Sequence, residues 1–257
     1  MLPKPGKDPH QTAHYGPISL LPVFSKILEK IICDRLKPIE KEKLIPDHQF
    51  GLRNKHSTID QMHRLVNEIL LAIGKKRYCT APFMGIAKAF DKVNHESLLQ
   101  TIKKHFSEQI HHLLESYLSN RTFIVEIKDV YSEVKDIKAG VLQGSVLGPI
   151  LYTLYTADIS TSTNSKILTF ADDTVVLVRR TNPETAVTLL QEHITKIKKW
   201  LQDKKIKATP SKCHHITFTL RKRKPPNIEL NGTHITQTRQ VNTLTLSRKN
   251  NKKEIKK

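Results

Sequence analysis

The sequence predicts an α+β fold in which strands alternate with long helices in the middle of the chain. Two observations support this prediction. Segments 58–76 and 185–201 repeat apolar residues every three or four positions, which is the period of an amphipathic helix. Short apolar or alternating segments, bounded by turn residues, lie between and after these helices and are typical of strands: 77–86, 123–137, 166–178 and 214–220.

The N-terminal elements follow from local signals. Residues 1–14 are rich in Pro and Gly, so we expect a loop there. Apolar residues at helical spacing between Ile18 and Glu42 predict a helix that begins near Pro22. Segment 45–58 is expected to be a loop with a glycine turn, after which Ser57 or Thr58 caps the next helix.

The later elements are predicted in the same way. Pro82 weakens the strand at 77–86, because proline removes a ladder donor. A turn and helix follow at 87–99, then a helix at 110–118, and a hairpin turns near Lys128 and Asp129. Beyond these we expect a glycine-rich loop, a hairpin, a helix and two strand-like segments, at 139–149, 166–178, 185–201, 214–220 and 227–235.

Composition limits the functional classes. Lys and Arg total 43 and Asp and Glu 24, so the formal net charge is +19, and 38% of the 257 residues are hydrophobic. That hydrophobic fraction excludes wholesale disorder. The charge favours a nucleic-acid partner bound in a salt-dependent way, although a solvated basic surface is the alternative. Part of the excess lies in two basic runs, 221–226 and 247–257, and the second is expected to be a disordered tail.

Cysteine usage and hydropathy indicate the compartment. The three cysteines, Cys33, Cys79 and Cys213, form no CxxC pair, which excludes a disulfide framework or a cysteine-based zinc site. No stretch of about 18 apolar residues occurs, and the first ten residues lack the apolar core of a secretory signal. We therefore expect an intracellular protein of the cytoplasm or nucleus, with no membrane partner.

Two adjacent acids are the sharpest local feature. Asp172 and Asp173 lie between apolar strands, at the tip of a predicted hairpin. Adjacent carboxylates repel each other, and a bound divalent cation would relieve that repulsion. Mg²⁺ is commonly held by one or two carboxylates together with substrate phosphates. The alternative is an ordinary acidic turn, because Asp favours turns.

Six segments extend this observation beyond one dipeptide. They occur in the order YGPISLLPVFSKILEKII (15–32), DHQFGLRNKHST (47–58), APFMGIAKAFDKVNH (81–95), AGVLQGSVLGPILYTLYTADI (139–159), TFADDTVVL (169–177) and SKCHHITF (211–218). This series resembles the reverse transcriptase domain of non-LTR retrotransposons, most closely the jockey-like elements. The resemblance places that domain at 15–246. It implies a right-hand polymerase with fingers and palm, the thumb being absent or incomplete.

The resemblance also implies a chemistry. The family's activity is RNA-directed DNA polymerisation, with an RNA template, a DNA primer and dNTPs as partners. Its palm holds two Mg²⁺ ions that activate the primer hydroxyl and stabilise the departing pyrophosphate. By position, Asp172 matches a metal ligand, and Asp173 is its neighbour in the same metal site.

Further positions match substrate-binding residues of the family. Phe90 matches the bulky residue that rejects a 2′-hydroxyl, and Gln143, Gly144 and Ser145 match a loop against the incoming nucleotide. Arg53 matches an arginine of the fingers subdomain that lies near the template or the nucleotide. Lys212 matches a lysine that lies near the departing pyrophosphate. Each has a simpler alternative: a core aromatic for Phe90, a plain glycine turn for the loop, and solvated cations for the other two.

The sequence departs from the family pattern at several positions. Gly85 occupies the place of the aspartate that ends the first palm strand, so a carboxylate is missing from the metal site. Gly16 replaces an arginine, and Leu142 a proline. We interpret the chain as a partial, degenerate copy whose nucleotidyl transfer is impaired, because losing one such electrostatic contact costs about 10²–10³ in rate. The alternatives are a catalytically dead nucleic-acid-binding remnant and a fragment that does not fold stably.

Overall fold

The computed structural model describes residues 2–3, 8, 10–11, 14–36, 44–51, 53, 55–86, 89–127, 129–206, 208, 212–223, 225–230 and 232–238. The predicted tail at 247–257 and the last residues of the predicted domain, 239–246, lie outside this part, as does Lys128 of the predicted hairpin. None of the described helices is long and apolar enough to cross a membrane.

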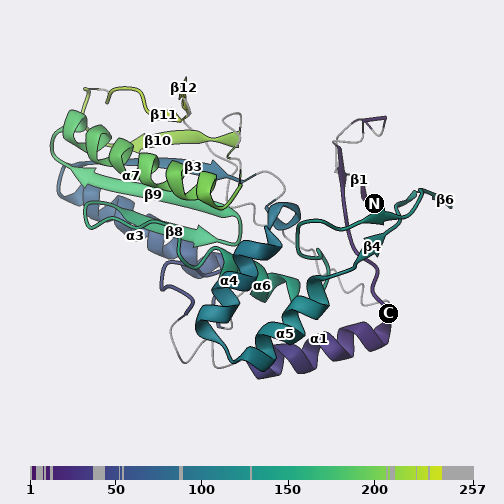
Figure 1. Cartoon of the computed structure of the whole chain (residues 1–257). Coiled ribbons are helices and arrows are strands. Elements are labelled where there is room, and N and C mark those ends of the chain that lie inside the picture. The colour runs from purple at the N-terminus through teal and green to yellow at the C-terminus, as the bar shows by residue number, and fades with distance from the viewer. Residues whose placement is uncertain are drawn as a thin grey trace, which may run out of the picture.

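A five-stranded sheet forms the centre of the fold (Figure 1). Its strand order is β13 (Thr236–Gln237), β10 (His214–Phe218), β3 (Tyr78–Gly85), β9 (Asp173–Arg180) and β8 (Lys166–Phe170). β3 is antiparallel to both of its neighbours, and β8 is antiparallel to β9, whereas β13 runs parallel to β10. Every residue of β3 is buried, so this central strand is covered on both faces.

One long helix covers each face of the sheet. In Figure 1, α7 (Pro183–Asp203) lies in front of the sheet and α3 (Thr58–Gly74) lies behind it. Alternate residues of a strand point to opposite faces, and the two buried clusters follow that rule. Val176 and Val178 of β9 belong to the α7 cluster, whereas Val175 and Leu177 belong to the α3 cluster. Both helices were predicted from their apolar period, and both are confirmed.

Caps set the helix boundaries. Ser57 and Asp60 form a reciprocal capping box at the start of α3, as the sequence predicts. Asn182 caps α7, and Asn94 caps α4 (His95–His105), which follows the short 3₁₀ helix η2 (Phe90–Lys92). The other helices of the described residues are α5 (Glu108–Leu118), α6 (Gly148–Tyr155) and α1 (Val23–Leu36), and α1 lies below α5, away from the sheet, in Figure 1.

Short two-stranded ladders make up the remaining strands. The predicted hairpin at 123–137 is present as two exposed ladders, β4 (Thr122–Phe123) with β7 (Lys135–Asp136) and β5 (Glu126–Ile127) with β6 (Val130–Tyr131). β11 (Glu229–Leu230) pairs with β12 (Thr233–His234). β1 (Leu2–Pro3) pairs with β2 (Tyr15–Gly16), so part of the segment expected to be a loop is a strand.

Pro82 interrupts the central ladder without shifting it. Thr80 pairs with Val178 and Phe83 pairs with Val175, and the two positions between them make no ladder pair with β9. The register is the same on both sides of this gap, so the strand contains no bulge. The proline therefore weakens the strand, as predicted, but leaves the alignment of its far end intact.

The apolar stripe of α1 is largely exposed, although the sequence predicts the helix itself correctly. Phe24 of α1 and Leu20, which precedes the helix, are each 85% exposed, whereas Ile32 and Leu36 are buried. The carboxylate of Glu29 is buried in the same helix. Periodicity identified the helix but not the face that packs against the rest of the fold, because that choice depends on tertiary partners.

Candidate active site

The two acids lie where β8 turns into β9. Asp172 is in the turn and Asp173 is the first residue of β9, which confirms the predicted hairpin. Both side chains are half-buried. Burial raises the pKa of Asp172, and a backbone hydrogen bond and the positive charge of Lys212 act in the opposite direction. The structure therefore brings Lys212 within electrostatic range of Asp172, and its predicted place near a pyrophosphate stays a prediction.

Gly85 lies directly across the ladder from Asp173. A Cβ atom at this position would lie 3.5 Å from Cβ of Lys212 and 3.7 Å from its carbonyl oxygen, which are ordinary contacts. The φ angle of Gly85 is also outside the left-handed region. A Cβ atom is therefore accommodated at position 85 without moving the backbone, next to Lys212 and at the ladder position that faces Asp173.

The acids present suit one hard cation but not two. Mg²⁺ can be held by one or two carboxylates, which Asp172 and Asp173 supply. A pair of ions needs further negative charge from the opposite strand, where Gly85 has no side-chain oxygen. Within the described ranges, a single group of three potential ligands comes together, and it lies elsewhere, on the surface of α5: His111, His112 and Glu115.

Phe90 packs flat against an aromatic ring beside the acids. Its ring stacks on Tyr152 of α6, with centroids 4.5 Å apart and planes 16° from parallel. Tyr152 is fully buried, and its hydroxyl has no hydrogen-bond partner among the described residues. Burial, then the charges of Asp172 and Asp173, raise the pKa of Tyr152. Phe90 is thus held near the acidic turn, and it is also part of the core, so the two interpretations of this residue are compatible.

The residues of the loop at 143–145 each make a different structural contribution. The Gln143 amide donates to Oδ1 of Asp91 at 3.0 Å, and its carbonyl accepts from the Ser19 backbone N–H at 2.9 Å. Gly144 has a φ of +95°, a conformation that suits glycine. Ser145 is buried, and its hydroxyl accepts from the N–H of Gly148 at 2.7 Å. Ser145 therefore satisfies the first backbone N–H of α6, a structural contact that the sequence pattern does not indicate.

Arg53 lies in the segment that precedes α3. Its guanidinium is 4.0 Å from the carboxylate of Asp47, and its side chain is 17% exposed. This contact is a loose ion pair, so the guanidinium keeps donors for another partner. The contacts of the described residues do not link Arg53 to the acidic turn.

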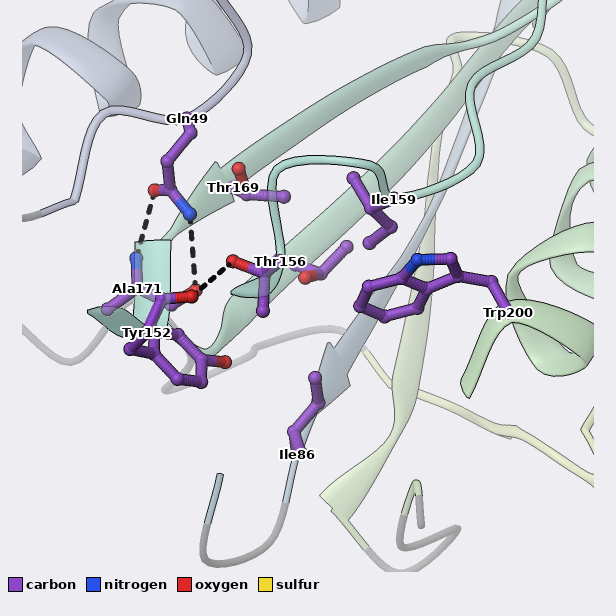
Figure 2. A pocket seen from close by; sticks show the side chains of 9 residues that line it. Gln49, Ile86, Tyr152, Thr156, Ile159, Thr169, Ala171 and Trp200 are labelled. Atoms are coloured by element: carbon purple, nitrogen blue, oxygen red, sulfur yellow. Dashed lines mark hydrogen bonds between the residues drawn. The ribbon is translucent and has the colours of Figure 1, made fainter. Parts of the chain in front are cut away.

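The side chain of Gln49 contacts the acidic turn, a contact that was not predicted from the sequence. Gln49 is 4% exposed, and its Oε1 accepts from the N–H groups of Gly51 at 2.8 Å and Ala171 at 3.2 Å. Its Nε2 donates to the Ala171 carbonyl at 3.5 Å (Figure 2). Gln49 and Gly51 lie in the segment HQFG, but no local sequence pattern indicates that Gln49 contacts a residue 122 positions away.

A small cavity lies beside this contact. Its volume is about 10 Å³, which is room for roughly one water molecule. Gln49, Ala171, Tyr152, Thr156 and Trp200 contribute to its lining (Figure 2). The cavity is too small to hold a nucleotide.

Comparisons with known proteins agree with this geometry. Residues 2–248 match the family model described as "Reverse transcriptase (RNA-dependent DNA polymerase)". The chain is 39% identical over 255 residues to the probable RNA-directed DNA polymerase from transposon BS of Drosophila melanogaster, which covers 95% of this chain and 28% of that protein. It is also 39% identical over 241 residues to the RNA-directed DNA polymerase from mobile element jockey of the same species, and this match covers 90% of this chain and 26% of that protein. The chain thus spans about a quarter of these relatives' length.

Solved structures share the fold. Apo telomerase from Candida tropicalis, truncated from its C-terminal domain, matches with a TM-score of 0.55 at 15% identity, over 81% of this chain and 42% of that chain. Telomerase from Candida albicans, in complex with a fragment of telomeric RNA, matches with a TM-score of 0.51 at 11% identity, over 82% of this chain and 36% of that chain. At such identities the likeness concerns the fold alone. The predicted α+β fold with polymerase fingers and palm is confirmed, as is the resemblance to jockey-like elements.

Proposed function

Because the chain belongs to the reverse transcriptase family, we propose that it is an RNA-directed DNA polymerase domain whose nucleotidyl transfer is impaired. One observation supports the impairment most strongly. Asp173 lies opposite a glycine in the β3–β9 ladder, so the strand facing the acidic turn contributes no carboxylate at that position. The proposed partners are an RNA template, a DNA primer and dNTPs.

The residues at the site have distinct tasks in this proposal. Asp172 and Asp173 would hold Mg²⁺, which when bound supplies positive charge to phosphate oxygens. Phe90, held flat on Tyr152, would form a rigid wall against the sugar. Lys212 places a cation beside the acids, where it would pair with phosphate once these carboxylates are neutralised.

A second candidate function follows from the same glycine. The net charge of +19 does not depend on position 85. A basic surface can bind nucleic acid through counterion release even when the metal site is incomplete. The alternative proposal is therefore a non-catalytic protein that binds RNA or DNA, with an affinity that falls steeply as salt rises.

Primer extension distinguishes the two candidates. The assay contains an RNA template, a DNA primer, Mg²⁺ and dNTPs, and it compares the unaltered chain with Gly85→Asp and with the matched control Gly85→Asn. Both substitutions fit sterically, because a Cβ atom at this position makes only ordinary contacts. We expect Gly85→Asp to exceed the other two proteins by about 10²–10³ in rate, since only Asp adds negative charge.

Each outcome has a clear meaning once circular dichroism shows that all three proteins are folded. Extension by the unaltered chain at the rate of Gly85→Asp would refute the proposed impairment. If none extends the primer while salt-sensitive binding of RNA or DNA persists, the non-catalytic alternative is supported. Loss of the restored activity in Gly85→Asp combined with Asp172→Asn would tie the chemistry to the acidic turn.

A further inference from the structure

The turn that carries the acids is conformationally unfavourable by itself. Ala171 has a φ of +54°, in the left-handed region that a Cβ atom disfavours. The other described non-glycine residues with positive φ have polar side chains: Lys55, Lys76, Asn120, Asp129 and Lys205. Alanine has no polar side chain with which to stabilise this conformation locally, so the surroundings must hold it.

Gln49 supplies that support. Its side-chain amide bonds to both backbone groups of Ala171, accepting from the N–H and donating to the carbonyl, as Figure 2 shows. The same Oε1 also accepts from the N–H of Gly51, which fixes the rotamer of the amide. Gly51 itself lies so close to the turn that a Cβ atom there would be 2.0 Å from the Ala171 nitrogen.

The segment that carries Gln49 is itself firmly attached. Phe50 N–H donates to the Thr169 carbonyl at 3.0 Å, and Thr169 N–H donates to the His48 carbonyl at 2.9 Å. The buried amide of Gln61 in α3 donates to both of those carbonyls, each at 2.9 Å. These contacts attach the segment to β8 and to the helix behind the sheet, and none of the four reaches Ala171 itself.

From these contacts we propose that Gln49 is a positioning residue, which holds Ala171 in the left-handed conformation and so fixes the direction of Asp172 and Asp173. The role in cation binding rests on the proposed function, whereas the holding of the turn does not. Without the amide, Ala171 relaxes toward ordinary backbone angles. The two carboxylates then change direction, and a divalent cation is bound more weakly.

The structural test is the exchange of the Ala171 amide proton, followed by NMR. Gln49→Leu removes both hydrogen bonds between the Gln49 amide and Ala171, and Gln61→Leu is the matched control, because it removes a buried amide that does not touch Ala171. At equal global stability, we expect Ala171 to exchange about tenfold faster in Gln49→Leu than in the control. Gln49→Glu keeps the accepting oxygen and is expected to restore most of the protection.

The functional test is Mn²⁺ affinity in the Gly85→Asp protein, measured by calorimetry. Removing an outer-shell partner of a metal ligand typically lowers metal affinity about 10–100-fold, and we expect this for Gln49→Leu. Gln61→Leu should change the affinity less than about threefold, and Gln49→Glu should lie between these two variants. If Gln49→Leu does not fold, Gln49→Glu takes its place. Faster Ala171 exchange and weaker Mn²⁺ binding than in Gln61→Leu would support the positioning role, and equal values would overturn it.

The outcomes separate this inference from the proposed function. Equal Ala171 exchange and equal Mn²⁺ affinity in Gln49→Leu and Gln61→Leu would overturn the positioning role. If the Gly85→Asp protein binds no Mn²⁺, the proposed function fails, and the cation-binding part of the inference fails with it. Faster exchange at Ala171 would in that case still support Gln49 as the residue that holds the turn.

Discussion

Substituting Gly51 by alanine tests how closely the segment before α3 approaches the acidic turn. The added Cβ atom would lie 2.0 Å from the nitrogen of Ala171 and 2.8 Å from the carbonyl carbon of Phe170. Both are backbone atoms of the turn, so no side-chain rotation can relieve the clash. Either the turn or the segment must move, and the hydrogen bonds of Gln49 to Ala171 would be strained.

The expected loss of stability follows from two opposing effects. Overpacking a tight site costs about 1–3 kcal/mol, and a backbone clash belongs at the upper end of that range. Replacing glycine also lowers the entropy of the unfolded chain, which returns about 0.4–1 kcal/mol. The net loss is about 2 kcal/mol, which corresponds to a fall of roughly 4–8 °C in Tm for a chain of this size.

Urea and thermal unfolding followed by circular dichroism measure this effect. Gly74→Ala is the matched control, because a Cβ atom at the end of α3 would meet nothing within 4 Å. In a helix this change should stabilise by about 0.4–1 kcal/mol. If Gly51→Ala proved as stable as Gly74→Ala, the close packing of this segment on the acidic turn would be refuted.

Three further predictions concern stability. Pro82→Val should restore a ladder donor in the central strand and raise stability by about 0.5–1.5 kcal/mol, and an unchanged urea midpoint would contradict this. In a urea titration, Glu29→Leu should destabilise the protein by about 2–4 kcal/mol, because it leaves the Val146 N–H and the Tyr117 hydroxyl without their acceptor. The control Tyr117→Phe removes one of these two bonds and should cost only about 1 kcal/mol. Burial, followed by the charge of Arg64, lowers the pKa of His48 to about 4. As the pH falls, His48 is therefore protonated in the unfolded chain before it is protonated in the folded chain. The contribution of neutral His48 to stability is complete above about pH 6.5 and decreases as the pH drops toward 4. Urea titrations between pH 7 and 5 should therefore show a shallower pH dependence in His48→Gln than in the unaltered chain, and equal slopes would argue against it.

The elements that the sequence predicts well are those that local rules determine. The capped start of α3 and the acidic hairpin each depend on residues within a few positions of one another. The role of Ser145 shows the limit of this approach. The hydroxyl of this buried serine accepts from the first backbone N–H of α6, a contact that no local pattern indicates, while its place against a nucleotide stays a prediction.

Long-range contacts account for most of what the sequence could not show. The amide of Gln49 and the turn at Ala171 are 122 residues apart, and neither residue carries a signal of the other. Glu29 is a second example, since its carboxylate accepts from Tyr117 and from the Val146 N–H within an otherwise apolar stripe. Periodicity alone would place that charged residue in solvent.

The continuous register of the central ladder bears most directly on function. Pro82 leaves a gap in the pairing of β3 with β9, yet Phe83 still meets Val175 and Gly85 still meets Asp173. The backbone therefore presents position 85 to the acidic turn, with space there for a side chain. Both proposed functions therefore depend on the same missing carboxylate, on a strand that is aligned with the acidic turn. For that reason a single substitution, and not a redesigned palm, is the decisive test of what this chain can do.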